Sequence, residues 1–203
     1  MFETKKIATG LLVVGGLWAI GNASWSPSAL AAPGVDFQPS SKIWIEGNST
    51  LHPFKATSKN WQIKATVTPG KAAKIGDITE LDVVIPVKSL KSGDGALDNN
   101  LYGAMGADKN PNVRFVMKNA KVNVTSSGDI EVDADGLLTI AGKEQSTKIS
   151  AKGELVGDTV KIKGSKEIKM TDFGVKPPEL MFGTIKTDNK IIVKYELVGK
   201  VTE

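Results

Sequence analysis

The alternation of apolar and polar residues with a period of two is the feature that most constrains how this chain can fold. It begins after about residue 40 and is clear where Val160, Ile162, Ile168 and Met170 alternate with lysine and glutamate. The same pattern recurs in residues 81–88 and 190–197, where Ile192 interrupts the polar face. A period of two is typical of antiparallel strands that have one face in water and one in a core. The chain is therefore expected to be an all-β protein.

The pattern predicts eight strands, near residues 42–48, 61–68, 78–88, 113–124, 129–140, 145–155, 158–171 and 189–201. The breaks between them contain turn-forming residues such as Pro69-Gly70, Gly157-Asp158 and Asp188-Asn189. The strands are long and the links between the late ones are short. This favours an eight-stranded antiparallel up-and-down β-barrel, or a tightly curled sheet, over a two-layer sandwich.

One segment has a helical period instead. Leu97, Leu101 and Met105 are spaced four residues apart, and Asp94 or Asp98 could act as the N-cap. The segment predicts a short helix in the connection between the third and fourth strands. Such a helix would either act as a lid over a cavity at one end of the barrel or simply close that end of the core.

The N-terminus has the layout of an export signal. Lys5 and Lys6 precede an apolar run that ends near Ile20, and alanines follow at 29, 31 and 32. We predict a signal peptide at residues 1–31, cleaved after Ala31 or, alternatively, after Ala32. The run is short for a membrane span, although an uncleaved anchor is the competing interpretation. Residues 32–40 are expected to be a flexible lead-in, followed by a single domain at 41–203.

Charge and cysteine content exclude several classes of function. The net charge of +4 comes from lysines, and Arg114 is the only arginine. Nucleic-acid binders usually cluster basic residues and use arginine for bidentate contacts, so we expect no nucleic-acid partner. A mildly basic surface is still compatible with transient contact with a membrane surface. The chain has no cysteine, which excludes disulfides and thiolate metal sites.

Residues that could support catalysis are scarce. His52 is the only histidine, and the sequence has no G-x-S-x-G motif, so a serine nucleophile would have no obvious base. Asp133 and Asp135 would share one face of a strand, either as ligands of a hard cation or, as we prefer, as solvated residues beside a turn. We therefore expect no catalytic residues, no metal, no cofactor and no enzymatic activity.

The inward-facing residues point to apolar chemistry. Alternation predicts that the aromatic residues Trp44, Trp61, Phe115 and Tyr195 line the interior with aliphatic residues. Such a lining suits a hydrocarbon chain, because burial of apolar surface contributes about 25 cal/mol per Å². A dry core without a ligand fits the same pattern.

Several motifs, taken in order, resemble the YceI-like family. They are Ser49–Phe54, Asp108–Phe115, Leu137–Glu144, Met170–Pro178 and Phe182–Thr187. The resemblance extends over roughly residues 40 to 201. It implies an exported, lipocalin-like barrel that binds an isoprenoid or another long apolar lipid.

Within these motifs, Asp172-Phe173-Gly174 looks like the turn near the barrel mouth of that family. The resemblance thus favours a hollow barrel with a ligand over a filled one. The resulting ligand-binding set is Trp44, Trp61, Leu97, Leu101, Met105, Phe115, Phe173 and Tyr195. The expected protein is a periplasmic or secreted, non-enzymatic lipid carrier, and the alternative is an envelope interaction module with a filled barrel.

Overall fold

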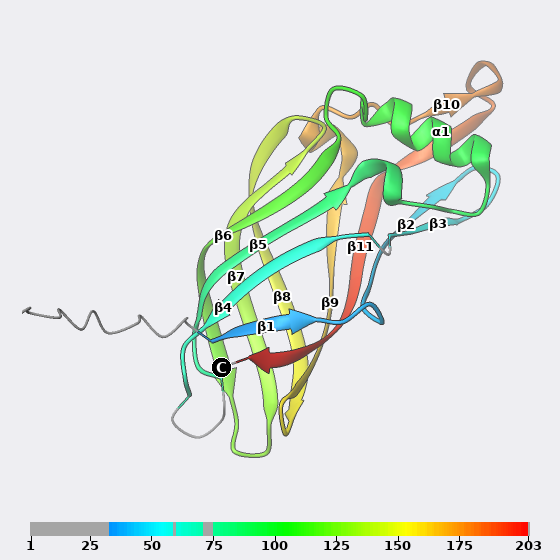
Figure 1. Cartoon of the computed structure of the whole chain (residues 1–203). Coiled ribbons are helices and arrows are strands. Elements are labelled where there is room, and N and C mark those ends of the chain that lie inside the picture. Colours follow the sequence, from blue (N-terminus) through cyan, green and yellow to red (C-terminus); the bar gives the residue numbers. More distant parts are fainter. Residues whose placement is uncertain (1–32, 59, 71–74, 203) are drawn as a thin grey trace, which may run out of the picture. The chain divides into compact units, whose positions relative to one another are not determined.

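Antiparallel strands form a closed ring in the computed structural model, which describes residues 33–58, 60–70 and 75–202 (Figure 1). The ring order is β1-β4-β5-β6-β7-β8-β9-β11, and β1 pairs back with β11. The strands are β1 (Gly34–Phe37), β2 (Lys42–Ser49), β3 (Phe54–Ser58), β4 (Gln62–Val67), β5 (Ile78–Pro86), β6 (Asn112–Val124), β7 (Asp129–Ile140), β8 (Lys143–Val156), β9 (Thr159–Lys169), β10 (Glu179–Leu180) and β11 (Ile185–Thr202). The predicted all-β antiparallel barrel of eight strands is thus confirmed. The predicted signal peptide lies outside the described residues.

Two walls of the barrel are each built from two short strands. β1 and β2 lie one after the other along β11, and β3 and β4 lie along the next wall. Ser41, at the break between β1 and β2, is buried, and its hydroxyl donates to Val198 O and accepts from Val198 N. The hydroxyl therefore replaces a backbone pairing where the strand is interrupted.

The strand β1 corrects one sequence-based expectation. Residues 32–40 were expected to be a flexible lead-in, but Gly34–Phe37 pair with the end of β11, and Gly34 also pairs with Thr66 of β4. Val35 packs against the core while Asp36 is exposed, so β1 alternates like the other strands. Its pattern is only four residues long and is therefore too short to be distinguished from a loop in the sequence.

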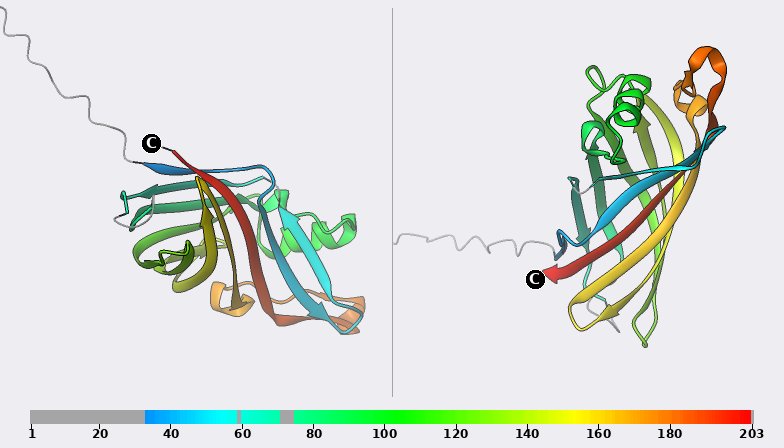
Figure 2. Two further views of the ribbon diagram at one scale, coloured as in Figure 1. Left: turned by 90° about the horizontal axis from the view of Figure 1, so that it is seen from below. Right: turned by 90° about the vertical axis from the view of Figure 1, so that its right-hand side faces the viewer.

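The helix α1 (Gly95–Ala104) lies at one end of the barrel (Figures 1 and 2). The prediction of a helix in this segment is right, but its place in the strand order is wrong. The helix follows β5 and not the third strand, because β1 and β3 were not predicted as separate strands. Asp94 is the N-cap, and its carboxylate accepts hydrogen bonds from Ala96 N and Leu97 N.

Short 3-10 segments complete this end of the barrel. They are η1 (Val87–Ser89), η2 (Met170–Phe173) and η3 (Met181–Gly183). Tyr102 of α1 donates to Leu90 O at 2.7 Å and to Lys88 O at 3.1 Å, which ties the helix to the residues after β5. The position of α1 is therefore determined by hydrogen bonds to the segment that connects it to β5.

Lysine and carboxylate side chains face each other across strands on the outer surface. Examples are Lys152–Glu131 (2.9 Å), Lys161–Glu154 (3.1 Å) and Lys190–Glu167 (3.0 Å). These side chains are more than half exposed, so each pair contributes little to stability. Their main effect is a well-solvated outer face with apolar residues turned inward.

Candidate binding cavity

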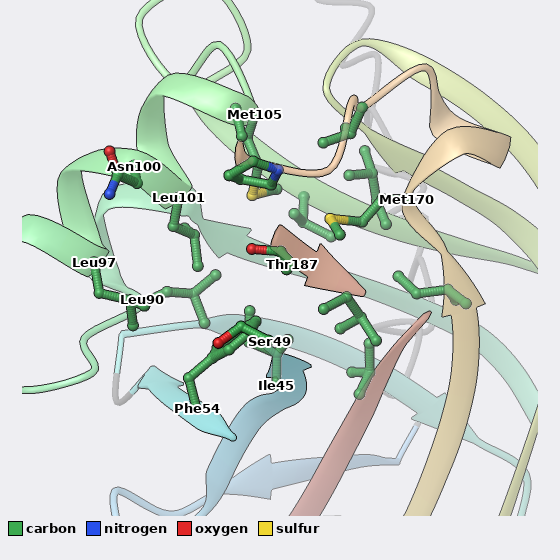
Figure 3. A pocket seen from close by; sticks show the side chains of 18 of the residues that line it. Ile45, Ser49, Phe54, Leu90, Leu97, Asn100, Leu101, Met105, Met170 and Thr187 are labelled. Atoms are coloured by element: carbon green, nitrogen blue, oxygen red, sulfur yellow. The ribbon is translucent and has the colours of Figure 1, made fainter. Parts of the chain in front are cut away.

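A cavity of about 270 Å³ lies inside the barrel at the end that α1 covers (Figure 3). Its walls come from β2, β3, β5, β6, β7, β9 and β11, and its cover comes from α1, η2 and the residues after η2. The apolar lining consists of Ile43, Ile45, Leu51, Phe54, Ile85, Leu90, Ala96, Leu97, Leu101, Ala104, Met105, Val113, Ile140, Ile168, Met170, Phe173, Val175, Pro178, Ile185, Ile191 and Val193. Ser49, His52, Asp94, Asn100 and Thr187 complete it.

Strand alternation places the wall residues. Ile43 and Ile45 of β2 point inward with Ile191 and Val193 of β11, because β2 and β11 are paired in register. Residues of the same parity on adjacent strands share one face, so these aliphatic side chains form a continuous surface. The wall has no charge to offer a polar ligand.

Two aromatic rings, neither of which lines the cavity, pack the barrel interior beyond it. Phe115 is buried in the core beside Ala134 and Leu138, and its ring lies over Gly136. The Tyr195 ring lies over Gly164, and its hydroxyl donates to Ser150 O at 2.7 Å. Beyond them, a second cluster of Val67, Ile75, Ile130 and Val160 fills the barrel interior. The interior is therefore hollow at one end and packed at the other.

Burial of Tyr195 has an electrostatic consequence. Desolvation disfavours the phenolate and raises the pKa of Tyr195 to about 12. The side chain therefore stays neutral and acts as a hydrogen-bond donor throughout the physiological pH range.

Two of the polar lining groups are already occupied by the fold. The Ser49 hydroxyl accepts from Leu51 N and His52 N and donates to His52 O, so it closes the turn after β2. His52 is exposed, and its Nδ1 lies 2.9 Å from Pro53 O. By contrast, the side chains of Asn100 and Thr187 make no hydrogen bond to any residue that the structure describes. Thr187 lies near the centre of the view in Figure 3.

The structure places four of the predicted ligand-binding residues in the cavity lining. Leu97, Leu101 and Met105 come from α1 and the residue after it, and Phe173 comes from the end of η2. Phe115 and Tyr195 also face the interior, but they do not line the cavity. Both side chains pack the interior beside the cavity, and their contact with a ligand stays a prediction.

Trp44 faces outward, contrary to the prediction that it lines the interior. Its neighbours Ile43 and Ile45 occupy the inward positions, and in a strand the residue between them points to the opposite face. The indole Nε1 donates to Glu46 at 2.7 Å, and Lys55 Nζ lies 4.5 Å from the ring centre. The aliphatic part of β2, and not its aromatic residue, faces the core.

Trp61 does not line the cavity either. It precedes β4 and is partly buried, and its Nε1 has no hydrogen-bond partner among the described residues. The sequence analysis also missed Phe54, whose ring lies over Gly47 in the cavity wall. Phe54 begins β3, and the sequence pattern had not indicated a strand there.

The acidic pair Asp133 and Asp135 lies on the outer face of β7. Ser150 donates to Asp133 at 2.5 Å, and Lys148 Nζ lies 3.9 Å from Asp135. Within residues 33–58, 60–70 and 75–202, no three His, Cys, Asp or Glu side chains gather as potential metal ligands. In the same part of the chain, no helix is both long and apolar enough to span a membrane.

The fold and the cavity together define an antiparallel eight-stranded barrel with an apolar cavity beneath a helix. Residues 39–198 match the YceI-like domain, and the chain belongs to this family. The resemblance of the sequence motifs to that family is thus confirmed. No curated protein matches the chain.

Solved structures of related barrels share the fold. BcnA of Burkholderia cenocepacia is 22% identical, with a TM-score of 0.64, and the match covers 80% of this chain and 99% of that one. A polyisoprenoid binding domain from Saccharophagus degradans, implicated in plant cell wall breakdown, is 13% identical, with a TM-score of 0.61 and coverage of 84% and 99%. The YceI protein of Campylobacter jejuni is 21% identical, with a TM-score of 0.59 and coverage of 74% and 86%.

Proposed function

We propose that this protein binds a long-chain apolar lipid, such as an isoprenoid, inside the barrel and carries or stores it without chemically changing it. The observation that carries the proposal is the apolar cavity of about 270 Å³ beneath α1. Its volume is close to the lower end of the range of about 300–1,000 Å³ that is typical of small-molecule sites. The polyisoprenoid binding domain of S. degradans, which has the same fold, supports the choice of ligand class.

The lining indicates how such a ligand would be oriented. Burial against aliphatic side chains would stabilise a hydrocarbon chain in proportion to its area, at about 25 cal/mol per Å². Thr187 and Asn100 offer hydrogen-bonding groups that are not used by the described part of the fold. The preferred ligand would therefore have an apolar chain and one small uncharged polar group that lies near these two side chains.

We also propose that the protein is exported and works in the periplasm or outside the cell. The support for this is the layout of residues 1–31, with two lysines, an apolar run and small residues before Ala32. N-terminal sequencing of the protein from its own host should give Ala32 or Pro33 as the first residue. A membrane-bound product that still begins at Met1 would contradict export with cleavage.

The ligand hypothesis is tested with two variants of α1. Leu101→Asp places a carboxylate against the cavity lining, where a charge without a partner is costly. Asn99→Asp introduces the same carboxylate on the exposed side of the same helix and serves as the matched control. Each protein is purified from its own host, adjusted to equal folded concentration by circular dichroism, and extracted for lipid mass spectrometry.

The wild type and Asn99→Asp should retain apolar lipid in near-stoichiometric amounts, and Leu101→Asp should retain several-fold less. If the wild type contains no lipid and takes up no added isoprenoid, the protein is a filled-barrel interaction module instead. Equal lipid content in all three proteins would keep the cavity but show that α1 does not retain the ligand.

A further inference from the structure

Large apolar side chains are exposed at the same end of the barrel as the cavity. Leu51 is 65% exposed, Met181 is 72% exposed and Phe182 is fully exposed. Leu51 lies in the turn between β2 and β3, and the other two lie in η3, between β10 and β11. We refer to these three residues as the apolar tip. Exposed apolar residues that cluster in this way typically mark an interaction site.

Hydrogen bonds hold the two segments of the apolar tip together. Thr50 N donates to Lys186 O at 3.0 Å, and Lys186 N donates to the Thr50 hydroxyl at 3.1 Å. The same hydroxyl donates to Thr184 O at 3.2 Å. These bonds join the turn after β2 to the β10–β11 hairpin, although the residues are more than 130 positions apart in the sequence. The apolar tip is thus one surface and not two separate loops.

The backbone of the hairpin is strained at the two exposed residues Met181 and Phe182. Met181 and Phe182 have φ angles of 51° and 55°, in the left-handed region that residues other than glycine rarely adopt. Strain of this kind tends to occur at functional sites. Figure 2 shows the β10–β11 hairpin standing out from the end of the barrel near α1. The fold therefore presents Met181 and Phe182 to the surroundings at a cost in free energy.

The apolar tip borders the entrance of the cavity. Leu51 belongs to both, and Pro178 and Ile185, which flank the hairpin, also line the cavity. A surface that covered the tip would therefore also face the entrance. This arrangement links the tip to the passage of an apolar molecule between the cavity and that surface.

The charges around the tip favour an anionic surface. Lys176 and Lys186 are exposed, and neither forms an ion pair with any residue that the structure describes. Glu179 is the only acidic residue between positions 176 and 186, so this segment has a net charge of +1 (two lysines minus one glutamate). Lysines beside apolar residues suit a lipid bilayer, where ammonium groups lie near phosphates while apolar side chains enter the acyl region.

We propose that the apolar tip inserts into the surface of an anionic lipid bilayer and thereby places the cavity entrance against the membrane. A narrow protruding hairpin suits insertion between lipids better than it suits a broad protein interface. Docking does not require a ligand in the barrel, whereas its use for ligand exchange rests on the proposed function.

The experiment uses the absence of cysteine in the chain. Thr184→Cys, beside the apolar tip, carries an environment-sensitive fluorophore. Val156→Cys is the matched control, because Val156 is 65% exposed as the last residue of β8, at the opposite end of the barrel. The labelled mature proteins, which begin at Ala32, are mixed with phosphatidylcholine vesicles, with and without phosphatidylglycerol and spin-labelled lipid. A label reports its own surroundings, so binding through other parts of the chain does not affect the result.

The label at position 184 should shift to the blue and be quenched by spin-labelled lipid, more strongly with phosphatidylglycerol, while the label at 156 should not respond. Met181→Asn with Phe182→Asn should raise the lipid concentration for half-maximal shift by about tenfold or more, since binding scales with buried apolar area. Asparagine tolerates positive φ, so this variant keeps the backbone of the hairpin. Val156→Asn should leave the response of the label at 184 unchanged.

Three outcomes would overturn the proposal. They are no response at position 184, an equal response at both positions, or a response that persists in the asparagine variant. A label at 184 that instead responds to protein concentration without vesicles would assign the tip to self-association. Lipid extraction from the asparagine variant tests membrane docking and lipid binding in the barrel separately. A variant that retains its ligand but no longer docks leaves the proposed function intact.

Discussion

Glycines determine how aromatic side chains lie inside this barrel. Three inward-facing glycines each lie beneath a ring, in the pairs Gly47–Phe54, Gly136–Phe115 and Gly164–Tyr195. A Cβ at any of these glycines would overlap with the ring. The absence of a side chain at these glycines therefore allows each ring to lie close to the backbone of the barrel wall.

Gly164→Ala should destabilise the protein by about 1–3 kcal/mol, because the new methyl group would lie 2.5 Å from Cζ of Tyr195 and the ring would have to move. The free energy of unfolding in urea measures the effect. Gly103→Ala is the control, since Gly103 is in α1 with nothing within 4 Å of the added Cβ, and it should stabilise by about 0.5–1 kcal/mol. Equal stability of Gly164→Ala and wild type would show that the Tyr195 ring is not held in place.

Tyr195 should make stability fall at high pH. Burial raises its pKa to about 12 from an ordinary value of 10.0, so the folded state keeps the proton after the unfolded state has lost it. The stabilisation is complete below pH 10.0 and is lost as the pH rises towards about 12. Urea unfolding across this window should show the loss in wild type and a smaller one in Tyr195→Phe. Identical pH profiles would contradict the assignment.

The helix α1 depends on a buried carboxylate in its first turn. Asp98 is only 7% exposed and accepts hydrogen bonds from Ser92 N at 2.8 Å and from the Ser92 hydroxyl at 2.7 Å. Burial opposes its ionisation, but these bonds and Lys91 outweigh burial and hold the pKa of Asp98 below its ordinary value of 3.8. The carboxylate thus connects α1 to the segment after β5.

Acid should therefore loosen α1. A lowered pKa in the folded state gives stability that is present above pH 3.8 and is lost as the pH falls through the folded value. Hydrogen exchange of the α1 amides, corrected for intrinsic rates and compared with β7, should show more frequent opening below pH 3.8. Asp98→Asn should open more often at neutral pH and depend less on acid. If both proteins respond to acid equally, another group is responsible.

The closure of the barrel depends on residues that are far apart in sequence. β1 near the start of the domain pairs with the last residues of β11, and this pairing removes the exposed edges that an open sheet would have. The same strand β11 also provides part of the cavity wall, through residues nearer its start.

Val35→Asp should disrupt the closure. Val35 packs against the core and against Gly199, so a carboxylate there would be buried without a partner and should cost about 2–4 kcal/mol. The expected result is a lower melting temperature. Asp36→Ala, on the exposed side of the same strand, should have little effect. A melting temperature for Val35→Asp that matched wild type would show that β1 is dispensable.

The sequence by itself determined the class of fold and most strand positions, because a period of two is a local property that each strand carries independently. It also located α1, narrowed its N-cap to Asp94 or Asp98, and indicated the lining residues Leu97, Leu101, Met105 and Phe173. Only the tertiary structure decided that Trp44 faces outward, that β1 closes the ring and that Phe115 and Tyr195 pack the interior without lining the cavity. These features depend on register and on contacts between distant strands, which a local pattern does not contain. The cavity also depends on such contacts, since it lies where residues of several strands meet a helix.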